Sequence, residues 1–281
     1  MRSRIAAAAA AALLVSACSA TTTGPPTSDA AAIAHIHGLG INPADGALYA
    51  GTHYGVYRLV PGRQPERVSV VVGDFMGFTV VGPDHFLGSG HPSEHAAGQP
   101  ANLGLIESTD AGRTWAPVAL SGDADFHALE YHDGLVIGLD STTRTVMVST
   151  DQRTWQRRAA VRAIDIAVSP ANPNDILATT AQGVVRSTDQ AATFAPAGTE
   201  PALAFLAWPD DGPLLGVDPA GVVYASSDSA HTWQRRRELG QPPQALLASG
   251  DGVLYVATDT AIHRSTDNGT TFETYYALQQ P

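Results

Sequence analysis

The stretch HIHGLG, residues 35–40, places two histidines one residue apart at the head of an apolar run. The chain has ten histidines, and eight of them lie between residues 35 and 132. Imidazole nitrogens bind zinc and copper, carboxylates such as Asp74 and Asp125 extend such a set toward zinc, and a thioether extends it toward copper. The residues that we expect to bind a metal ion or a small polar ligand are His35, His37, His53, Met76, His91 and His127. The alternative is that they are hydrogen-bonded packing residues, because no short metal-binding motif joins them.

Whether these side chains can meet depends on the elements that carry them, and a repeat defines those elements. One short motif recurs as STDAGRTW at 108, STDQRTW at 149, STDQAATF at 187, SSDSAHTW at 226 and STDNGTTF at 265. The starts are 41, 38, 39 and 39 residues apart. This period is typical of a four-stranded propeller blade. We therefore predict an all-β fold, a β-propeller of six four-stranded blades, with seven blades as the alternative.

These motifs resemble the Asp-box, or BNR, repeat, whose pattern is Ser-x-Asp-x-Gly-x-Thr-Trp. The chain from about residue 33 to residue 275 is also similar to bacterial BNR-repeat lipoproteins that are commonly filed as glycosyl hydrolase (sialidase)-like. The resemblance implies that the repeated aspartates close hairpin turns on the rim and do no chemistry. The aspartates set aside on this ground are Asp110, Asp151, Asp189, Asp228 and Asp267.

The blade alignment brings the candidate residues to one face of the disc. The innermost strands of the six blades open near His37, Met76, His127, Ile164, Leu203 and Gln244. His53 and His91 fall in loops between the second and third strands of their blades. Because successive strands are antiparallel, these loops and the starts of the innermost strands share one face. The sequence therefore predicts a His/Met-rich channel mouth, and we further expect a strand from one terminus to close the ring by pairing with the other.

Catalysis is less well supported than binding. The resemblance to sialidases implies an arginine triad and a Tyr/Glu nucleophile pair, but no three arginines open the innermost strands. A general glycosidase needs two carboxyl groups about 5 to 9.5 Å apart. The acids that we place near the mouth are Asp74, Asp125 and Asp165. We therefore expect a ligand-, metal- or partner-binding or assembly protein, with an exo-acting, sialidase-like glycosyl hydrolase as the alternative.

The first residues have the pattern of an export signal. Residues 1–17 combine Arg2 and Arg4 with an apolar, alanine-rich run, and Cys18 follows. VSAC, residues 15–18, resembles a bacterial lipobox, which implies lipidation of Cys18. Residues 18–32 then form a small, polar tether, and residues 33–281 a single propeller domain. We expect a lipid-anchored protein on the extracytoplasmic face of the cell membrane.

Composition limits the partners. The formal net charge is -11 and every basic residue is arginine, which argues against a nucleic-acid surface. Cys18 is the only cysteine, so no internal disulfide can form. The expected partners are the membrane, through the lipid anchor, and a protein at the long loop 91–104 or a small polar or glycan ligand. The expected cofactor is a transition metal, copper or zinc.

Overall fold

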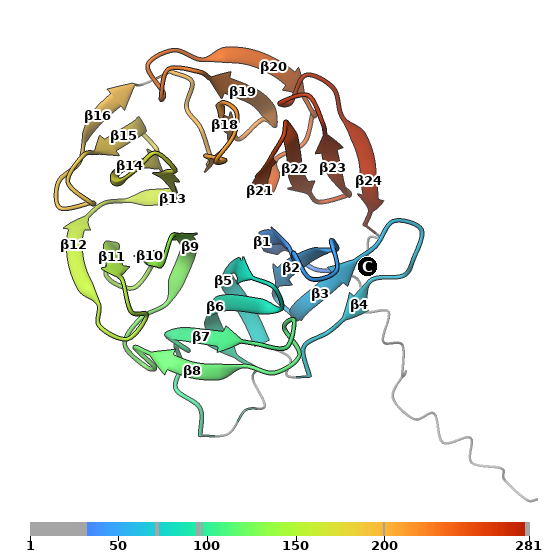
Figure 1. Cartoon of the computed structure of the whole chain (residues 1–281), viewed down its shortest axis with the longest axis vertical. Coiled ribbons are helices and arrows are strands. Elements are labelled where there is room, and N and C mark those ends of the chain that lie inside the picture. The colour runs from blue at the N-terminus through green and yellow to red at the C-terminus, as the bar shows by residue number, and fades with distance from the viewer. Residues whose placement is uncertain (1–32, 71–72, 94–95, 97, 199, 279–281) are drawn as a thin grey trace, which may run out of the picture.

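The computed structural model describes residues 33–278, except residues 71–72, 94–95, 97 and 199. These residues form six four-stranded antiparallel sheets set like blades around a central axis (Figure 1). The predicted all-β propeller of six blades is therefore confirmed. The predicted signal segment, Cys18 and the tether lie outside the described residues. Within the described part of the chain, no helix is long and apolar enough to cross a bilayer.

Each blade consists of four strands that follow one another in the chain. Blade 1 has β1 (Ile36–Ile41), β2 (Leu48–Thr52), β3 (Gly55–Leu59) and β4 (Glu66–Arg67). Blade 2 has β5 (Gly73–Gly82), β6 (His85–Pro92), β7 (Leu105–Ser108) and β8 (Ala116–Ala119). Blade 3 has β9 (Phe126–His132), β10 (Leu135–Asp140), β11 (Thr145–Ser149) and β12 (Gln156–Ala160).

The second half of the chain repeats this order. Blade 4 has β13 (Ala163–Ser169), β14 (Asn172–Thr180), β15 (Gly183–Ser187) and β16 (Ala195–Gly198). Blade 5 has β17 (Phe205–Ala207), β18 (Leu214–Val217), β19 (Val222–Ser226) and β20 (Gln234–Glu238). Blade 6 has β21 (Pro243–Gly250), β22 (Val253–Thr258), β23 (Ala261–Ser265) and β24 (Glu273–Ala277).

The core is divided among the blade interfaces. Every residue of β2 and of β10 is buried, because adjacent blades cover both faces of these strands. Six apolar clusters follow one another around the ring, each shared by two neighbouring blades. Burial of apolar side chains on both faces of every blade therefore stabilises the disc without a disulfide.

Ring closure differs from our expectation. Blades 1 and 6 each consist of strands from one chain segment, so the predicted exchange of a terminal strand is wrong for the described residues. The physical reason is that β24 occupies the outer position of blade 6 and pairs with β23. Closure comes instead from an apolar cluster that includes Tyr57 and Tyr255. In addition, the Ile36 N–H donates to Gln244 Oε1 at 2.9 Å.

A β-bulge opens the innermost strand of most blades. In blade 1 the register shifts between Ile36 and Gly38, which leaves His37 unpaired with β2. The residues in the corresponding bulges are His37, Met76, His127, Ile164 and Gln244. A bulge redirects one side chain out of the regular alternation of a strand. The blade alignment made from the sequence thus matches the register of the strands at these five positions.

The repeated motifs form tight turns of one design. In four of them the serine hydroxyl accepts the backbone N–H four residues later, and the aspartate accepts the backbone N–H of a threonine. The shortened copy at 149–155 keeps the bonds from the Arg153 and Thr154 N–H groups to Asp151. These bonds satisfy the polar backbone of the turns, which is a structural role.

Removing one of these serines should destabilise the fold modestly. Ser226 is buried and its hydroxyl accepts the N–H groups of Asp228 and Ala230. Ser226→Ala leaves the Ala230 N–H buried without this acceptor, so we expect a loss of about 1–2 kcal/mol in the free energy of unfolding. Urea unfolding monitored by tryptophan fluorescence measures this loss. The neighbouring Ser227 is exposed, and Ser227→Ala should change stability by less than about 0.5 kcal/mol.

Candidate metal centres at the channel mouth

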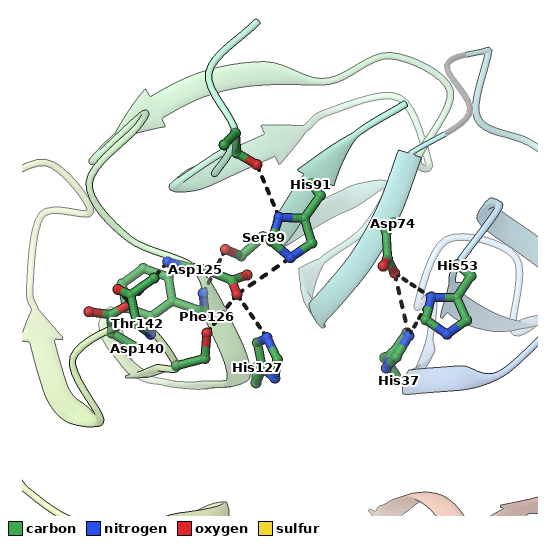
Figure 2. A network of polar contacts seen from close by, with 12 residues as sticks. His37, His53, Asp74, Ser89, His91, Asp125, Phe126, His127, Asp140 and Thr142 are labelled. Atoms are coloured by element: carbon green, nitrogen blue, oxygen red, sulfur yellow. Dashed lines mark hydrogen bonds and ion pairs between the residues drawn. The ribbon is translucent and has the colours of Figure 1, made fainter. Parts of the chain in front are cut away.

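Two clusters of imidazoles and carboxylates lie where neighbouring blades meet (Figure 2). We call His37, His53 and Asp74 site 1, and His91, Asp125 and His127 site 2. In each cluster one ligand atom per residue lies within 4.8 Å of the others.

Each site takes residues from two blades. In site 1, His37 comes from the bulge of β1, His53 follows β2, and Asp74 comes from β5 of the next blade. Site 2 combines His91, near the end of β6, with Asp125 and His127 at the start of β9. The two centres therefore lie in adjacent interfaces on the same face of the disc.

The three ligand atoms of site 1 form a compact triangle. His37 Nε2 lies 3.3 Å from His53 Nδ1, and these nitrogens lie 3.4 and 2.9 Å from Asp74 Oδ1. Ligand atoms about 2.0–2.1 Å from a tetrahedral zinc ion lie roughly 3.3–3.4 Å apart, and those at right angles roughly 3.0 Å apart. The observed triangle thus has the dimensions of one face of a metal coordination shell.

The carboxylate of site 1 lies against two imidazole nitrogens. Asp74 Oδ1 is buried and no well-aligned hydrogen bond reaches it, although both imidazole nitrogens are close. Burial alone would raise the pKa of Asp74, but the polar contacts with His37 and His53 lower it below its ordinary value. The carboxylate is therefore ionised at neutral pH and faces two nitrogens that can act as electron-pair donors. A cation between the three atoms would satisfy all of them.

The ligands of site 2 have well-defined hydrogen-bond partners around them. Asp125 Oδ2 lies 2.8 Å from His127 Nε2 and 3.6 Å from His91 Nε2. The Ser141 hydroxyl donates to the same carboxylate oxygen at 2.6 Å. His91 Nδ1 lies 3.0 Å from the Ala101 carbonyl oxygen, which can only accept, so Nδ1 carries the proton. In the neutral imidazole, Nε2 then presents its lone pair toward Asp125, as a metal ligand must.

The Asp125 carboxylate is held by Ser141 and His127, and its backbone is held by a second aspartate, Asp140. Only 4% of the Asp125 side chain is exposed, against 38% of His127, so the acid forms the floor of the site. Burial would raise the pKa of Asp125, but its contacts with His127 and Ser141 lower it below its ordinary value. The Asp125 N–H donates to Asp140 Oδ1 at 3.1 Å, which holds the start of β9 in place. A rigid, ionised floor with two more exposed imidazoles is suited to binding and releasing an ion.

One glycine permits the close approach of strands at these sites. Gly90 lies in β6 with a φ of 138°, next to His91. A Cβ atom at this position would lie 1.9 Å from the carbonyl oxygen of Asp74. Only glycine therefore allows β6 to pass so near the backbone that carries the site 1 carboxylate.

The remaining predicted residues are placed as follows. The His35 ring lies 4.8 Å from the His37 ring and 5.7 Å from the His53 ring, measured between centroids. Burial and the neighbouring His37 and His53 lower the pKa of His35, which favours the neutral, metal-binding form. Met76 occupies the bulge of β5 and is half-buried, but the two clusters consist of imidazoles and carboxylates.

The third predicted acid lies deeper in the channel, together with an acid that the sequence analysis missed. A cavity of about 150 Å³ at the axis is lined by Asp165 and Glu130, and also by His37 and His127. Burial raises the pKa of Asp165 to about 7, although it accepts the Leu206 N–H at 2.8 Å. Burial and the charge of Asp165 raise the pKa of Glu130 to about 8. The signal that could have found Glu130 is its charge within the innermost strand, FHALEY.

The class of protein defined by this geometry is a six-bladed β-propeller with two histidine–carboxylate clusters on one face. No family model matches the chain. A xyloglucanase of Hypocrea jecorina is 30% identical over 171 residues, which cover 57% of this chain and 20% of that enzyme. The chain thus spans about a fifth of the length of this relative, and the shared segment does not by itself carry over the enzyme's activity.

Solved structures show the same fold at low sequence identity. The GH74 enzyme of Niastella koreensis superposes with a TM-score of 0.61 and 14% identity, covering 88% of this chain and 46% of the enzyme. YCF48 bound to D1 peptide superposes with a TM-score of 0.57 and 15% identity, covering 87% of this chain and 82% of that protein. The neighbours therefore include both glycoside hydrolase and peptide-binding propellers.

Proposed function

We propose that this protein binds divalent transition-metal ions at its channel mouth, one ion in site 1 and one in site 2. The observation that carries the proposal is the triangle of His37 Nε2, His53 Nδ1 and Asp74 Oδ1, with sides of 2.9 to 3.4 Å. Two imidazoles and one carboxylate suit zinc or copper(II) better than calcium or magnesium, which prefer oxygen ligands.

The two centres differ in the number of imidazoles beside them. In site 1, 10% of the His37 side chain is exposed and His35 stands beside it as a further imidazole. A fourth ligand, the imidazole of His35, would complete a tetrahedral shell, which is typical of tightly held zinc. Site 2 offers three protein ligands and leaves positions for water or a ligand. We infer that site 1 retains its ion and that site 2 exchanges or presents one.

Metal content of the purified protein tests this proposal. After incubation with zinc or copper(II) and removal of the excess, we expect about two ions per chain by elemental mass spectrometry. His37→Ala combined with His127→Ala removes one ligand from each site and should abolish retention of both ions. The matched control is His85→Ala with His231→Ala, which removes two histidines outside both clusters. Wild-type protein that retains no metal, or a control variant that loses it equally, would contradict the proposal.

The proposal also includes a location at the membrane surface, which is supported by the amino-terminal sequence pattern. A lipidated Cys18 and the tether would hold the propeller at the outer surface of the membrane, where metal ions are captured from the surroundings or passed to a partner. Loop 91–104 carries His91, so a protein that docks on this loop would also approach site 2. Such a partner-binding or assembly role is supported by the peptide-bound propeller among the structural neighbours.

Glycoside hydrolysis is the second candidate, and two observations favour it. One is the partial match to a xyloglucanase. The other is the carboxyl pair Glu130 and Asp165 in the channel, because a raised pKa is what a general acid requires. Asp74 and Asp125 have lowered pKa values and lie beside histidines, which suits them to metal binding rather than to general acid catalysis. Release of reducing sugar from xyloglucan by the wild type but not by Glu130→Gln would support this alternative.

A further inference from the structure

A groove lies next to site 2, in addition to the cavity at the axis. This groove of about 400 Å³ lies between blades 3 and 4. Its lining residues are His127, Leu139, Asp140, Ser141, Arg144, Val161, Arg162, Ala163 and Ile164. His127 belongs to site 2, and Ser141 donates to the site 2 carboxylate. The groove therefore opens directly on site 2, and its size falls in the range of small-molecule pockets, about 300–1,000 Å³.

The groove combines an apolar wall with positive charge. Ile164 is 50% exposed and lies at the bulge of β13, where it forms part of the wall with Val161 and Ala163. Arg144 and Arg162 are exposed, and among the described residues neither guanidinium has an ion pair or hydrogen bond. Two guanidinium groups without a partner thus line the same groove as this apolar wall.

The one acid in the groove does not neutralise these arginines. Asp140 is fully buried, and its carboxylate is occupied by the Thr142 and Thr143 hydroxyls and by the Asp125 N–H. Arg157 lies 3.8 Å from the same carboxylate and offsets its charge. Among the residues that line the groove, Arg144 and Arg162 are therefore the charges that no carboxylate neutralises directly.

The backbone at Arg144 is held in an uncommon conformation. Its φ is 56°, in the left-handed region that a residue with a side chain seldom adopts. The Arg144 carbonyl oxygen accepts the Val161 N–H at 2.8 Å, which ties the loop of blade 3 to the segment that enters blade 4. This bond fixes the two sides of the groove relative to each other, so the arginines are presented by a rigid frame.

The geometry points to a binding site for a small organic carboxylate with an apolar body, placed in this groove. Its carboxylate would pair with Arg144 and Arg162, because a guanidinium matches a carboxylate in two parallel hydrogen bonds. Its apolar body would cover Ile164. The far end of the molecule would approach His127, where an ion in site 2 has open positions. Only this last contact rests on the proposed metal binding.

Titration of the protein with octanoate tests the inference. We expect saturable binding by calorimetry to the metal-free protein, with much weaker binding of octanol and of octyltrimethylammonium. Arg144→Gln with Arg162→Gln should weaken octanoate binding at least 10-fold. The matched control is Arg153→Gln with Arg237→Gln, which removes the same charge from exposed positions outside the groove and should change binding less than twofold.

The outcomes separate this inference from the metal proposal. Equal binding of octanoate and octanol, equal weakening by both double variants, or no octanoate binding with or without zinc would overturn the groove assignment. If the protein binds octanoate but retains no zinc after incubation with zinc, the groove assignment stands and the metal centres are refuted. Unchanged thermal midpoints of the variants would show that the exposed arginines act on binding and not on folding.

Discussion

Asp125→Asn should remove the ion from site 2 and leave site 1 loaded, and Asp74→Asn should do the reverse. The substitution keeps the shape of the side chain but removes the negative charge that balances the ion. Loss of a charged ligand should lower the affinity of the affected site by about 100-fold or more, since even outer-shell changes cost 10- to 100-fold. Zinc titration by calorimetry should show one tight site in each variant and two in the wild type.

One control variant tests whether the loss of metal is specific to these two aspartates. Asp133 is 94% exposed and belongs to neither cluster, so Asp133→Asn should keep both ions. Retention of two tight ions by Asp74→Asn and by Asp125→Asn would show that these carboxylates are not ligands. Loss of both ions in one variant, with an unchanged thermal midpoint, would show that the centres are coupled rather than independent.

The regular repeat of the turn motif allowed the fold to be predicted from the sequence. Each repeated turn contains a serine and an aspartate that accept hydrogen bonds from backbone groups of the same turn. The motif can therefore be recognised in the sequence, and it marks the end of a blade. From these marks the innermost strands could be aligned, and the bulges at His37, Met76 and His127 fall at the aligned positions. Ring closure was not predictable in the same way, because it depends on whether the last repeat supplies its own outer strand.

The grouping of residues into two candidate sites could not be predicted from the repeat in the same way. Each site joins a histidine of one blade to an aspartate of the next, and such lateral contacts leave no fixed spacing in the chain. Asp74 and Asp125 could therefore be named from the sequence both as metal ligands and as candidate acids, but not assigned to particular histidines; the structure places each of them beside two imidazoles. Equivalent position also does not guarantee equivalent role, since Met76 aligns with His37 but has no imidazole to offer.

The stability of the protein should fall as the pH rises from 5 to 9, because of Glu130 and Asp165. Their pKa values are raised in the folded state to about 8 and about 7, from ordinary values of 4.5 and 3.8. Above about pH 5 the unfolded chain releases these protons while the folded chain keeps them, so each further increase in pH favours unfolding. The stabilisation is present below the unfolded pKa and is lost completely above about pH 8. Because the channel admits some water, we expect a total loss of about 2–4 kcal/mol.

Other titratable groups change the free energy of unfolding in the opposite direction, or change it outside the range from pH 5 to 9. The effect of Glu130 and Asp165 is therefore measured as a difference between two proteins. Burial lowers the pKa values of His35 and His263, so these groups add stability as the pH rises toward their ordinary value of 6.5. Asp74 and Asp125 have lowered pKa values, and their contribution is already complete above about pH 5. The measurement is therefore the difference between wild type and Glu130→Gln with Asp165→Asn, by urea unfolding of metal-free protein at pH 5, 7 and 9. The free energy of unfolding of the double variant should fall much less with pH than that of the wild type. An equal fall in both proteins would show that neither carboxyl group holds its proton in the channel.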